Sequence, residues 1–141
     1  MATEVTFDEA NPQEHVGLAA KCIRDGFVIV APHDNGYVYL TDAFSHDSVR
    51  AMHVLRGDQL GVQAQVLIAD TKMIDGIARD LTDDARLLME TFWPGALSLS
   101  LRPQRGLSWD LGDDGKLDWI SVRIPQHEDR KSTRLNSSHD Q

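Results

Sequence analysis

Apolar and polar positions follow two different periods along the chain, and these periods predict helices and strands in turn. Apolar residues at helical spacing predict helices over about residues 11–25, 45–56, 70–77 and 82–93. Gly26 and Gly57 are predicted to end the first two helices. A side chain able to cap a helix N-terminus stands at each start: Asn11, Ser45 or Asp47, Asp70 or Thr71, and Thr82.

Runs of apolar residues between the helices predict strands. Residues 27–31 (FVIVA) and 65–69 (QVLIA) are predicted as buried strands, the first of the kind found in the middle of a sheet. Leucine alternates with serine over residues 97–101, as in a strand with one buried face, and a last strand is predicted at 119–124. Residues 32–45 are rich in turn residues, so we expect an irregular loop there. Alternating strands and helices predict a single α/β domain with a mainly open, twisted sheet.

A Trp-Pro-Gly corner separates the fourth predicted helix from the alternating strand. Pro94 cannot continue a helix, and Gly95 admits backbone angles that other residues avoid. The chain is therefore expected to turn sharply just after Phe92 and Trp93, two large aromatic residues that favour burial.

Composition narrows the class of protein. The 141 residues are 41% hydrophobic and 26% charged, as in soluble globular domains, and no apolar run approaches the ~20 residues of a membrane span. The acidic N-terminus lacks the features of a secretory signal, so we expect a cytoplasmic protein. A net charge of −8 argues against a strongly electrostatic nucleic-acid binder, although a local basic patch remains possible.

Residues that could carry metal, redox or stacking chemistry are few. Cys22 is the single cysteine, which excludes a disulfide framework within the chain and predicts a buried, reduced thiol. Trp109 and Trp119 flank an acidic turn and are predicted to be packing groups, because no cluster of Arg or Lys accompanies them. Four histidines show no metal-ligand spacing and are predicted as surface or helix residues: His15, His46, His53 and His127.

The end of the chain differs from the rest. Residues 129–139 (DRKSTRLNSSH) show no apolar periodicity and match the translation of a common sequencing-adapter read. We therefore expect residues 129–141 to be a non-native tail and residues 1–128 to form the domain, incomplete at its C-terminus.

Several stretches, in this order, resemble the YrdC-like threonylcarbamoyl-adenylate synthases, the first enzymes of the tRNA threonylcarbamoyladenosine pathway. The resemblance runs from about residue 11 to about residue 127. It is carried by an apolar strand before Pro32, by Asp34 and Tyr37, by Asp42-Ala43, and by VLIAD at 66–70, FWPGALSL at 92–99 and SVRIP at 121–125.

The resemblance implies an open, twisted, mixed sheet with flanking helices and an adenylation that needs no protein nucleophile. Threonine takes up bicarbonate, the carbamate attacks the α-phosphate of ATP, and pyrophosphate leaves. The implied ligands are L-threonine, bicarbonate and ATP with Mg²⁺, and tRNA or double-stranded RNA is a weaker implied partner. Such a site depends on positioning and on neutralising charge.

The implied threonine pocket begins in a loop that has the sequence pattern P-T-[DE]-T-V-Y-G-L in the family. Here residues 32–39 read PHDNGYVY, so that His33 and Asn35 replace the two threonines while Tyr37 is retained. The resemblance makes these three residues threonine-site candidates. Asn35 with the glycine after it is alternatively only a tight turn.

Arg123, within SVRIP, resembles the family's clamp on the threonine carboxylate, a task that suits a bidentate guanidinium. The alternative is a strand-end arginine exposed to solvent.

The implied nucleotide site is a basic cluster with the sequence pattern K-x-R-P-x-x-K-P-L in the family. It corresponds to residues 56–64 of this chain. Arg56 alone keeps its charge, while Asp58 stands in place of an arginine and Val62 in place of a lysine. Charge-assisted contacts contribute roughly 1.5 to 3 kcal/mol each, so losing two could lower ATP affinity or rate by several powers of ten. A second hypothesis follows: a catalytically degenerate paralogue that binds a nucleotide, RNA or protein. Leu67 also replaces a histidine of some members, and the later S-x-x-N element is absent.

Overall fold

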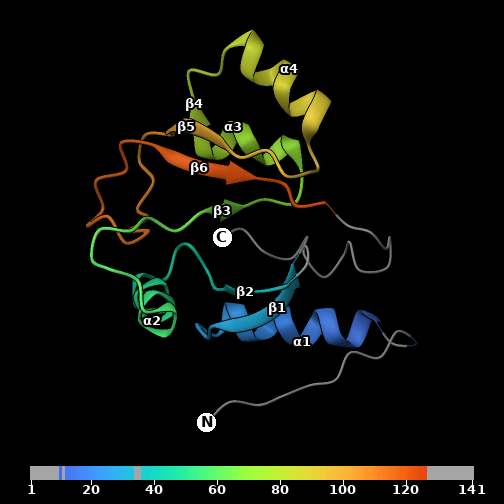
Figure 1. Cartoon of the computed structure of the whole chain (residues 1–141), viewed down its shortest axis with the longest axis vertical. Helices are drawn as coiled ribbons and strands as arrows, with labels where there is room; N and C mark the ends of the chain where they lie inside the picture. Colours follow the sequence, from blue (N-terminus) through green and yellow to red (C-terminus); the bar gives the residue numbers. More distant parts are fainter. Residues whose placement is uncertain (1–9, 11, 34–35, 127–141) are drawn as a thin grey trace.

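The computed structural model describes residues 10, 12–33 and 36–126. Figure 1 shows two groups of elements, a four-stranded sheet with α3 and α4 beside it and a hairpin with α1 and α2 beside it. The helices are α1 (Pro12–Arg24), α2 (His46–Arg56), the 3-10 turn η1 (Thr71–Met73), α3 (Ile74–Ile77) and α4 (Asp83–Phe92). The strands are β1 (Ile29–His33), β2 (Gly36–Leu40), β3 (Val66–Leu67), β4 (Ala78–Arg79), β5 (Leu99–Pro103) and β6 (Ile120–Arg123).

Local capping chemistry sets the helix ends as predicted. The Ser45 hydroxyl accepts from the Ser48 N–H, and the Thr82 hydroxyl accepts from the Ala85 N–H at 3.0 Å. Gly57 closes α2 in the left-handed conformation at φ 73°, and Asp70 caps η1. The predicted cap at Asn11 lies outside the described residues.

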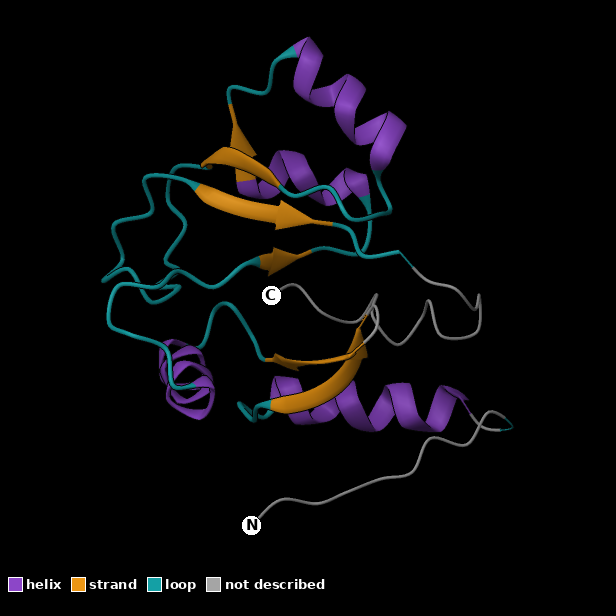
Figure 2. Ribbon diagram, viewed as in Figure 1, coloured by secondary structure: helices purple, strands orange, loops and turns teal. Residues whose placement is uncertain are grey.

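The four-stranded sheet has the order β3-β6-β5-β4 and packs one face on the main core (Figure 2). β3 and β6 are parallel, whereas β6 pairs antiparallel with β5 and β5 pairs antiparallel with β4. The mixed, open sheet confirms the predicted fold class. The core beneath it includes Val66, Ile68, Ile74, Met89, Trp93, Leu101, Ile120 and Val122.

The hairpin corrects two predictions. β1 was predicted as a central strand, but within the described part of the chain it pairs with β2 alone, and Val30 is 60% exposed. Residues 36–40 were predicted as part of an irregular loop and instead form β2, in register from Ile29 opposite Leu40 to His33 opposite Gly36. The physical reason is the run Tyr-Val-Tyr-Leu, whose aromatic and β-branched residues favour a strand and outweigh the turn residues before it.

Two smaller points complete the comparison with the sequence. Cys22 is a free thiol, but it is half-buried in α1 rather than buried as predicted. Within the described residues, no helix is long and apolar enough to cross a membrane.

Candidate functional site

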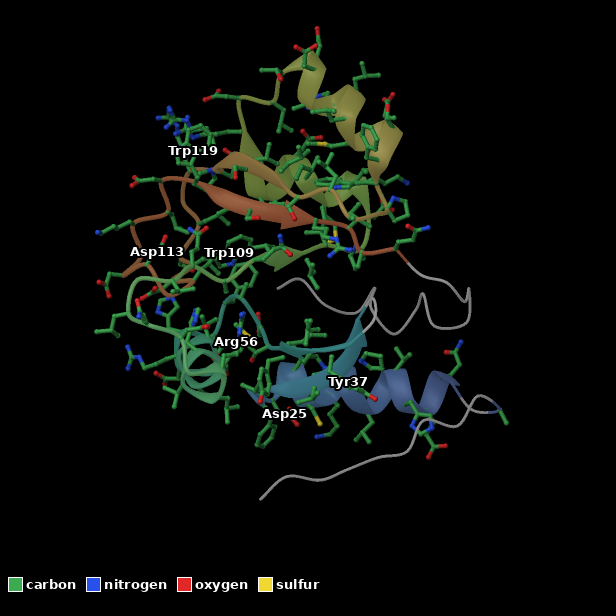
Figure 3. The ribbon with its side chains drawn as sticks, in the orientation of Figure 1. Asp25, Tyr37, Arg56, Trp109, Asp113 and Trp119 are labelled. Atoms are coloured by element: carbon green, nitrogen blue, oxygen red, sulfur yellow. The ribbon has the colours of Figure 1, made fainter. Side chains whose placement is uncertain are left out.

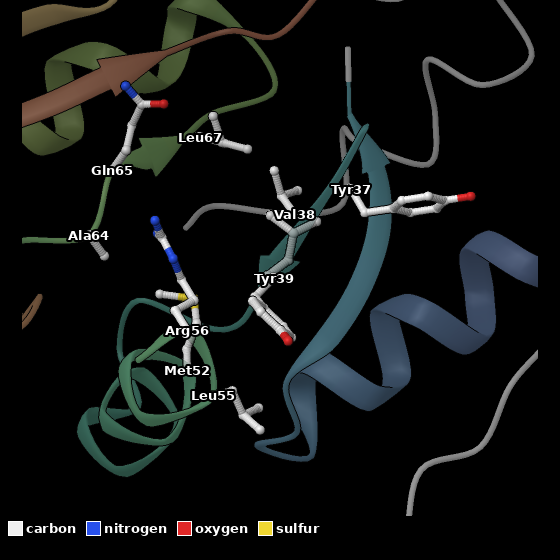
Figure 4. Close-up of a pocket in the computed structure, with 10 residues that line it drawn as sticks. Tyr37, Val38, Tyr39, Met52, Leu55, Arg56, Ala64, Gln65 and Leu67 are labelled. Carbon is white, nitrogen blue, oxygen red and sulfur yellow. The ribbon is translucent and has the colours of Figure 1, made fainter. Parts of the chain in front are cut away.

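A cavity of about 480 Å³ lies between the hairpin, α2 and the segment that leads into β3 (Figure 4). Most of the residues that line it are apolar or aromatic, but polar atoms make up at least half of its exposed wall, and one arginine and one glutamine are among the lining residues. The lining residues come from β2 (Tyr37, Val38, Tyr39 and Leu40), from α2 (Met52, Leu55 and Arg56) and from residues 64–67 (Ala64, Gln65 and Leu67).

Arg56 is the cation of this cavity. It stands in the last turn of α2, its side chain is 51% exposed, and its guanidinium reaches toward the segment that carries Ala64 and Gln65 (Figure 4). The Arg56 Nε atom lies 3.5 Å from Asp58 Oδ2. Arg56, the residue predicted to bind a phosphate of the nucleotide, therefore lines a cavity. That it binds a phosphate stays a prediction.

The threonine-site candidates on the hairpin are only partly described. Tyr37 borders the cavity, but it is 76% exposed and its ring points away from Arg56 (Figure 4). The side chain of His33 and all of Asn35 lie outside what the structure describes. Leu67, which replaces a family histidine, forms part of the cavity wall.

Arg123 is not the exposed strand-end arginine of the alternative interpretation. The residue is 9% exposed, and its Nε–H donates to the Gly95 carbonyl at 2.7 Å. The Gly95 N–H in turn donates to the Ile124 carbonyl at 2.9 Å. Arg123 thus ties the end of β6 to the Trp-Pro-Gly corner. It lies outside the wall of the cavity, although its register partner Leu67 belongs to that wall.

We expect Arg123→Met to destabilise the protein by about 1.5 to 3 kcal/mol, the usual contribution of a hydrogen bond from a charged group. The reason is that the buried Gly95 carbonyl would lose the guanidinium donor. Urea unfolding followed by tryptophan fluorescence measures the change. An unaltered midpoint would show that the bond from Arg123 to Gly95 does not hold the corner.

A polar row on the sheet was missed by the sequence interpretation. Gln65 Nε2 donates to the hydroxyl of Ser98 at 2.7 Å and to the hydroxyl of Ser121 at 3.1 Å. These residues stand on three segments that only the sheet order brings together, on the face opposite the core. Because Gln65 also lines the cavity, the row extends its polar surface. Serine alternating with leucine is the one sequence signal that points to it.

The two tryptophans on either side of the acidic turn differ in environment (Figure 3). Trp109 is 2% exposed and packs edge-on against Phe44, with ring centroids 5.4 Å apart, which confirms a packing role. Trp119 is 49% exposed, and the Arg102 guanidinium lies 4.4 Å above its ring. The sequence interpretation did not anticipate this pair, because strand pairing is what brings Arg102 beside Trp119.

His53 is a helix residue, one of the two environments predicted for it. Its side chain on α2 is only 12% exposed, and both ring nitrogens lie against acceptors. Nδ1 is 2.9 Å from Asp58 Oδ2, and Nε2 is 2.9 Å from the Leu111 carbonyl. Asp58 is therefore shared between His53 and Arg56 and is not a bare anion beside the cavity.

The family model described as "Telomere recombination", for Sua5, YciO and YrdC, matches residues 21–132. The chain belongs to the Sua5/YciO/YrdC family. A putative threonylcarbamoyl-AMP synthase of Mycobacterium tuberculosis strain H37Rv is 34% identical over 125 residues, which are 86% of this chain and 57% of that protein. The threonylcarbamoyl-AMP synthase of Bacillus subtilis is 26% identical over 124 residues, which are 88% of this chain and 36% of that protein. The chain thus spans about half the length of the mycobacterial relative.

Solved structures support the fold. Sua5 of P. abyssi complexed with L-threonine superposes with a TM-score of 0.76 at 24% identity, over 95% of this chain and 37% of that chain. YciO of E. coli superposes with a TM-score of 0.74 at 21% identity, over 89% of this chain and 59% of that chain. The family resemblance and the predicted open sheet are both confirmed.

Proposed function

We propose that this protein carries the threonylcarbamoyl-AMP synthase activity for which its relatives are named. The observation that carries the proposal is the 34% identity to the mycobacterial protein across 86% of the chain. The cavity beside α2 supports it, because an arginine faces a pocket large enough for an amino acid or part of a nucleotide. The product would serve tRNA threonylcarbamoyladenosine modification.

The proposed reaction balances without a protein nucleophile. The amine of L-threonine combines with bicarbonate, which yields a carbamate and water. A carbamate oxygen then attacks the α-phosphate of ATP, the bond from the α-phosphate to the pyrophosphate breaks, and threonylcarbamoyl-AMP forms. Charge develops on the phosphate oxygens, so cations fixed nearby would be the main contribution of the protein.

In this proposal Arg56 meets a phosphate of the nucleotide, and the hairpin and Arg123 form the threonine side. His33, Asn35 and Tyr37 would contact threonine from the hairpin. Arg123, whose Nε–H donates to the Gly95 carbonyl, would contact the threonine carboxylate from the end of β6. We propose that Mg²⁺ arrives bound to ATP; the residues that the structure describes contain no group of three His, Cys, Asp or Glu that could hold a metal.

A second candidate function is a binding module for a nucleotide, an RNA or a protein without catalysis. It is favoured by Asp58 and Val62, which stand where cations of the basic cluster are expected. RNA binding has one local feature in its favour, the Arg102–Trp119 pair, against a net charge of −8. A steep fall of RNA affinity with salt would support a phosphate-dependent RNA contact.

The test is exchange of labelled pyrophosphate into ATP by the 141-residue chain, with and without L-threonine and bicarbonate. The synthase proposal predicts exchange that needs both compounds. Exchange at the level of the blank, together with measurable ATP binding, would favour the binding module and overturn the synthase.

A further inference from the structure

A chain of contacts runs from the loop before β6 to the cavity. The Leu111 carbonyl lies 2.9 Å from His53 Nε2, and His53 Nδ1 lies 2.9 Å from Asp58 Oδ2. The same carboxylate oxygen lies 3.5 Å from Arg56 Nε. His53 and Arg56 stand about one turn apart on α2, and Asp58 follows just after that helix. One carboxylate therefore joins an anchored imidazole to the half-exposed guanidinium of the cavity.

The contacts of His53 with the loop at Leu111 and Gly112 are tightly packed. A Cβ atom added at Gly112 would lie 2.5 Å from His53 Nε2, so the loop backbone closely approaches the imidazole. The Leu111 carbonyl also accepts from the Ala64 N–H at 2.7 Å. The side chains of His53 and Asp58 are only 12% and 15% exposed. Asp58 is thus held in place independently of Arg56.

We propose that Asp58 is a positioning residue that directs Arg56 into the cavity to bind an anionic group of the ligand. The inference rests on the proposed function, in which that anion is a phosphate of ATP. With Nε on the Asp58 side, the two terminal nitrogens of Arg56 remain for the ligand. Within the described part of the chain, Asp58 is the one carboxylate within 4 Å of an Arg56 nitrogen. In this proposal Asp58 orients Arg56, the basic residue that the chain retains, and does more than stand in place of a family arginine.

Two effects of the Asp58 charge oppose each other. Repulsion of an anionic ligand would weaken binding, but the carboxylate already contacts His53 and the charged Arg56 and is mostly buried. Ordering of a long side chain before the ligand arrives favours binding by about two- to tenfold. We infer that the ordering of Arg56 is the larger effect.

The test compares Asp58→Asn with the unmodified 141-residue chain, with ATP as the probe in isothermal titration calorimetry. We expect ATP to bind about two- to tenfold more weakly to the variant, as loss of side-chain ordering predicts. The same substitution in an Arg56→Gln background should change ATP affinity by less than twofold, because no guanidinium remains to be positioned. Asp75→Asn is the matched control, since Asp75 pairs at 2.9 Å with Arg86, which is 49% exposed and outside the cavity wall.

A spectroscopic signal reports on Arg56 without any ligand. The Nε–Hε resonance of Arg56 in a nitrogen-labelled sample should shift in Asp58→Asn and should keep its position in Asp75→Asn. A purely structural role of Asp58 would lower thermal stability without coupling to residue 56 in the ATP titrations.

The outcomes separate this inference from the proposed function. Equal or tighter ATP binding by Asp58→Asn, or equal weakening in the Arg56→Gln background, would overturn the positioning role. If the unmodified chain binds no ATP, the proposed function fails, and the Arg56 resonance alone decides the inference. An unshifted resonance in Asp58→Asn would then reject it, and a shifted one would uphold it.

Discussion

Gly112→Ala is expected to destabilise the protein by about 3 kcal/mol or more, because two separate costs add. The backbone at Gly112 has φ of 108°, which side-chain-bearing residues rarely adopt. A Cβ atom there would also clash with the Val62 carbonyl oxygen and lie 2.5 Å from His53 Nε2. The loop would have to withdraw from α2. Urea unfolding followed by circular dichroism measures the loss.

Gly106→Ala is the matched control for this prediction. Gly106 also has positive φ, at 86°, but an added Cβ would meet nothing within 4 Å. We expect it to cost only about 1 kcal/mol, the penalty of the left-handed conformation. Equal losses in the two variants would contradict the close approach of Gly112 to His53.

Arg56→Gln is expected to lower threonine-dependent pyrophosphate exchange by about 10- to 100-fold, the equivalent of one charge-assisted contact of roughly 1.5 to 3 kcal/mol. The reason is that Arg56 supplies the charge of the cavity, whose other lining residues carry no cation. Glutamine keeps a hydrogen-bond donor of similar reach but loses the charge. Exchange rates at saturating and at limiting ATP show whether KM or kcat changes.

The control for Arg56→Gln is Arg86→Gln. Arg86 has nearly the same exposure, 49% against 51%, and likewise pairs with an aspartate, but it stands on α4 away from the cavity. Its exchange rate should stay within about twofold of the unmodified chain, as for most surface changes. A similar loss in both variants would indicate a general effect of charge and not a site at Arg56.

Features that depend on neighbouring residues could be predicted from the sequence. Ser45, Thr82 and Gly57 act on helix ends within three or four residues, and all three do what their side chains or backbone favour. The Trp93 corner is tied in part to the distant residues Arg123 and Ile124, but its indole N–H donates to the Leu97 carbonyl only four residues on. Such signals need no knowledge of the rest of the fold.

Features that depend on strand pairing could not be predicted in the same way. β4 is only two residues long and exists because it pairs with β5. Val30 is exposed because β1 pairs in a hairpin with β2, and the apolar sequence of β1 does not reveal that pairing. For the same reason Gln65 and Ser121, 56 positions apart, showed no sign of meeting.

The candidate site shows the same division. Arg56 could be proposed from its place in the chain, and it does line a cavity. The contact between His53 and Asp58 could not be predicted from the sequence, because the orientation of the His53 ring depends on the Leu111 carbonyl of a distant loop. From the sequence, Asp58 only replaces a basic residue of the family. In the structure it contacts Arg56, the basic residue that is retained.

Formation of threonylcarbamoyl-AMP from labelled bicarbonate is the direct test of the proposed synthase activity. The 141-residue chain is incubated with ATP, Mg²⁺, L-threonine and labelled bicarbonate, and the nucleotides are separated by chromatography. If the protein is a synthase, a labelled nucleotide forms that requires both ATP and threonine, and its amount falls by about 10- to 100-fold in Arg56→Gln, as expected for one charge-assisted contact. Absence of labelled nucleotide with the unmodified, folded chain would show that the protein is not a threonylcarbamoyl-AMP synthase.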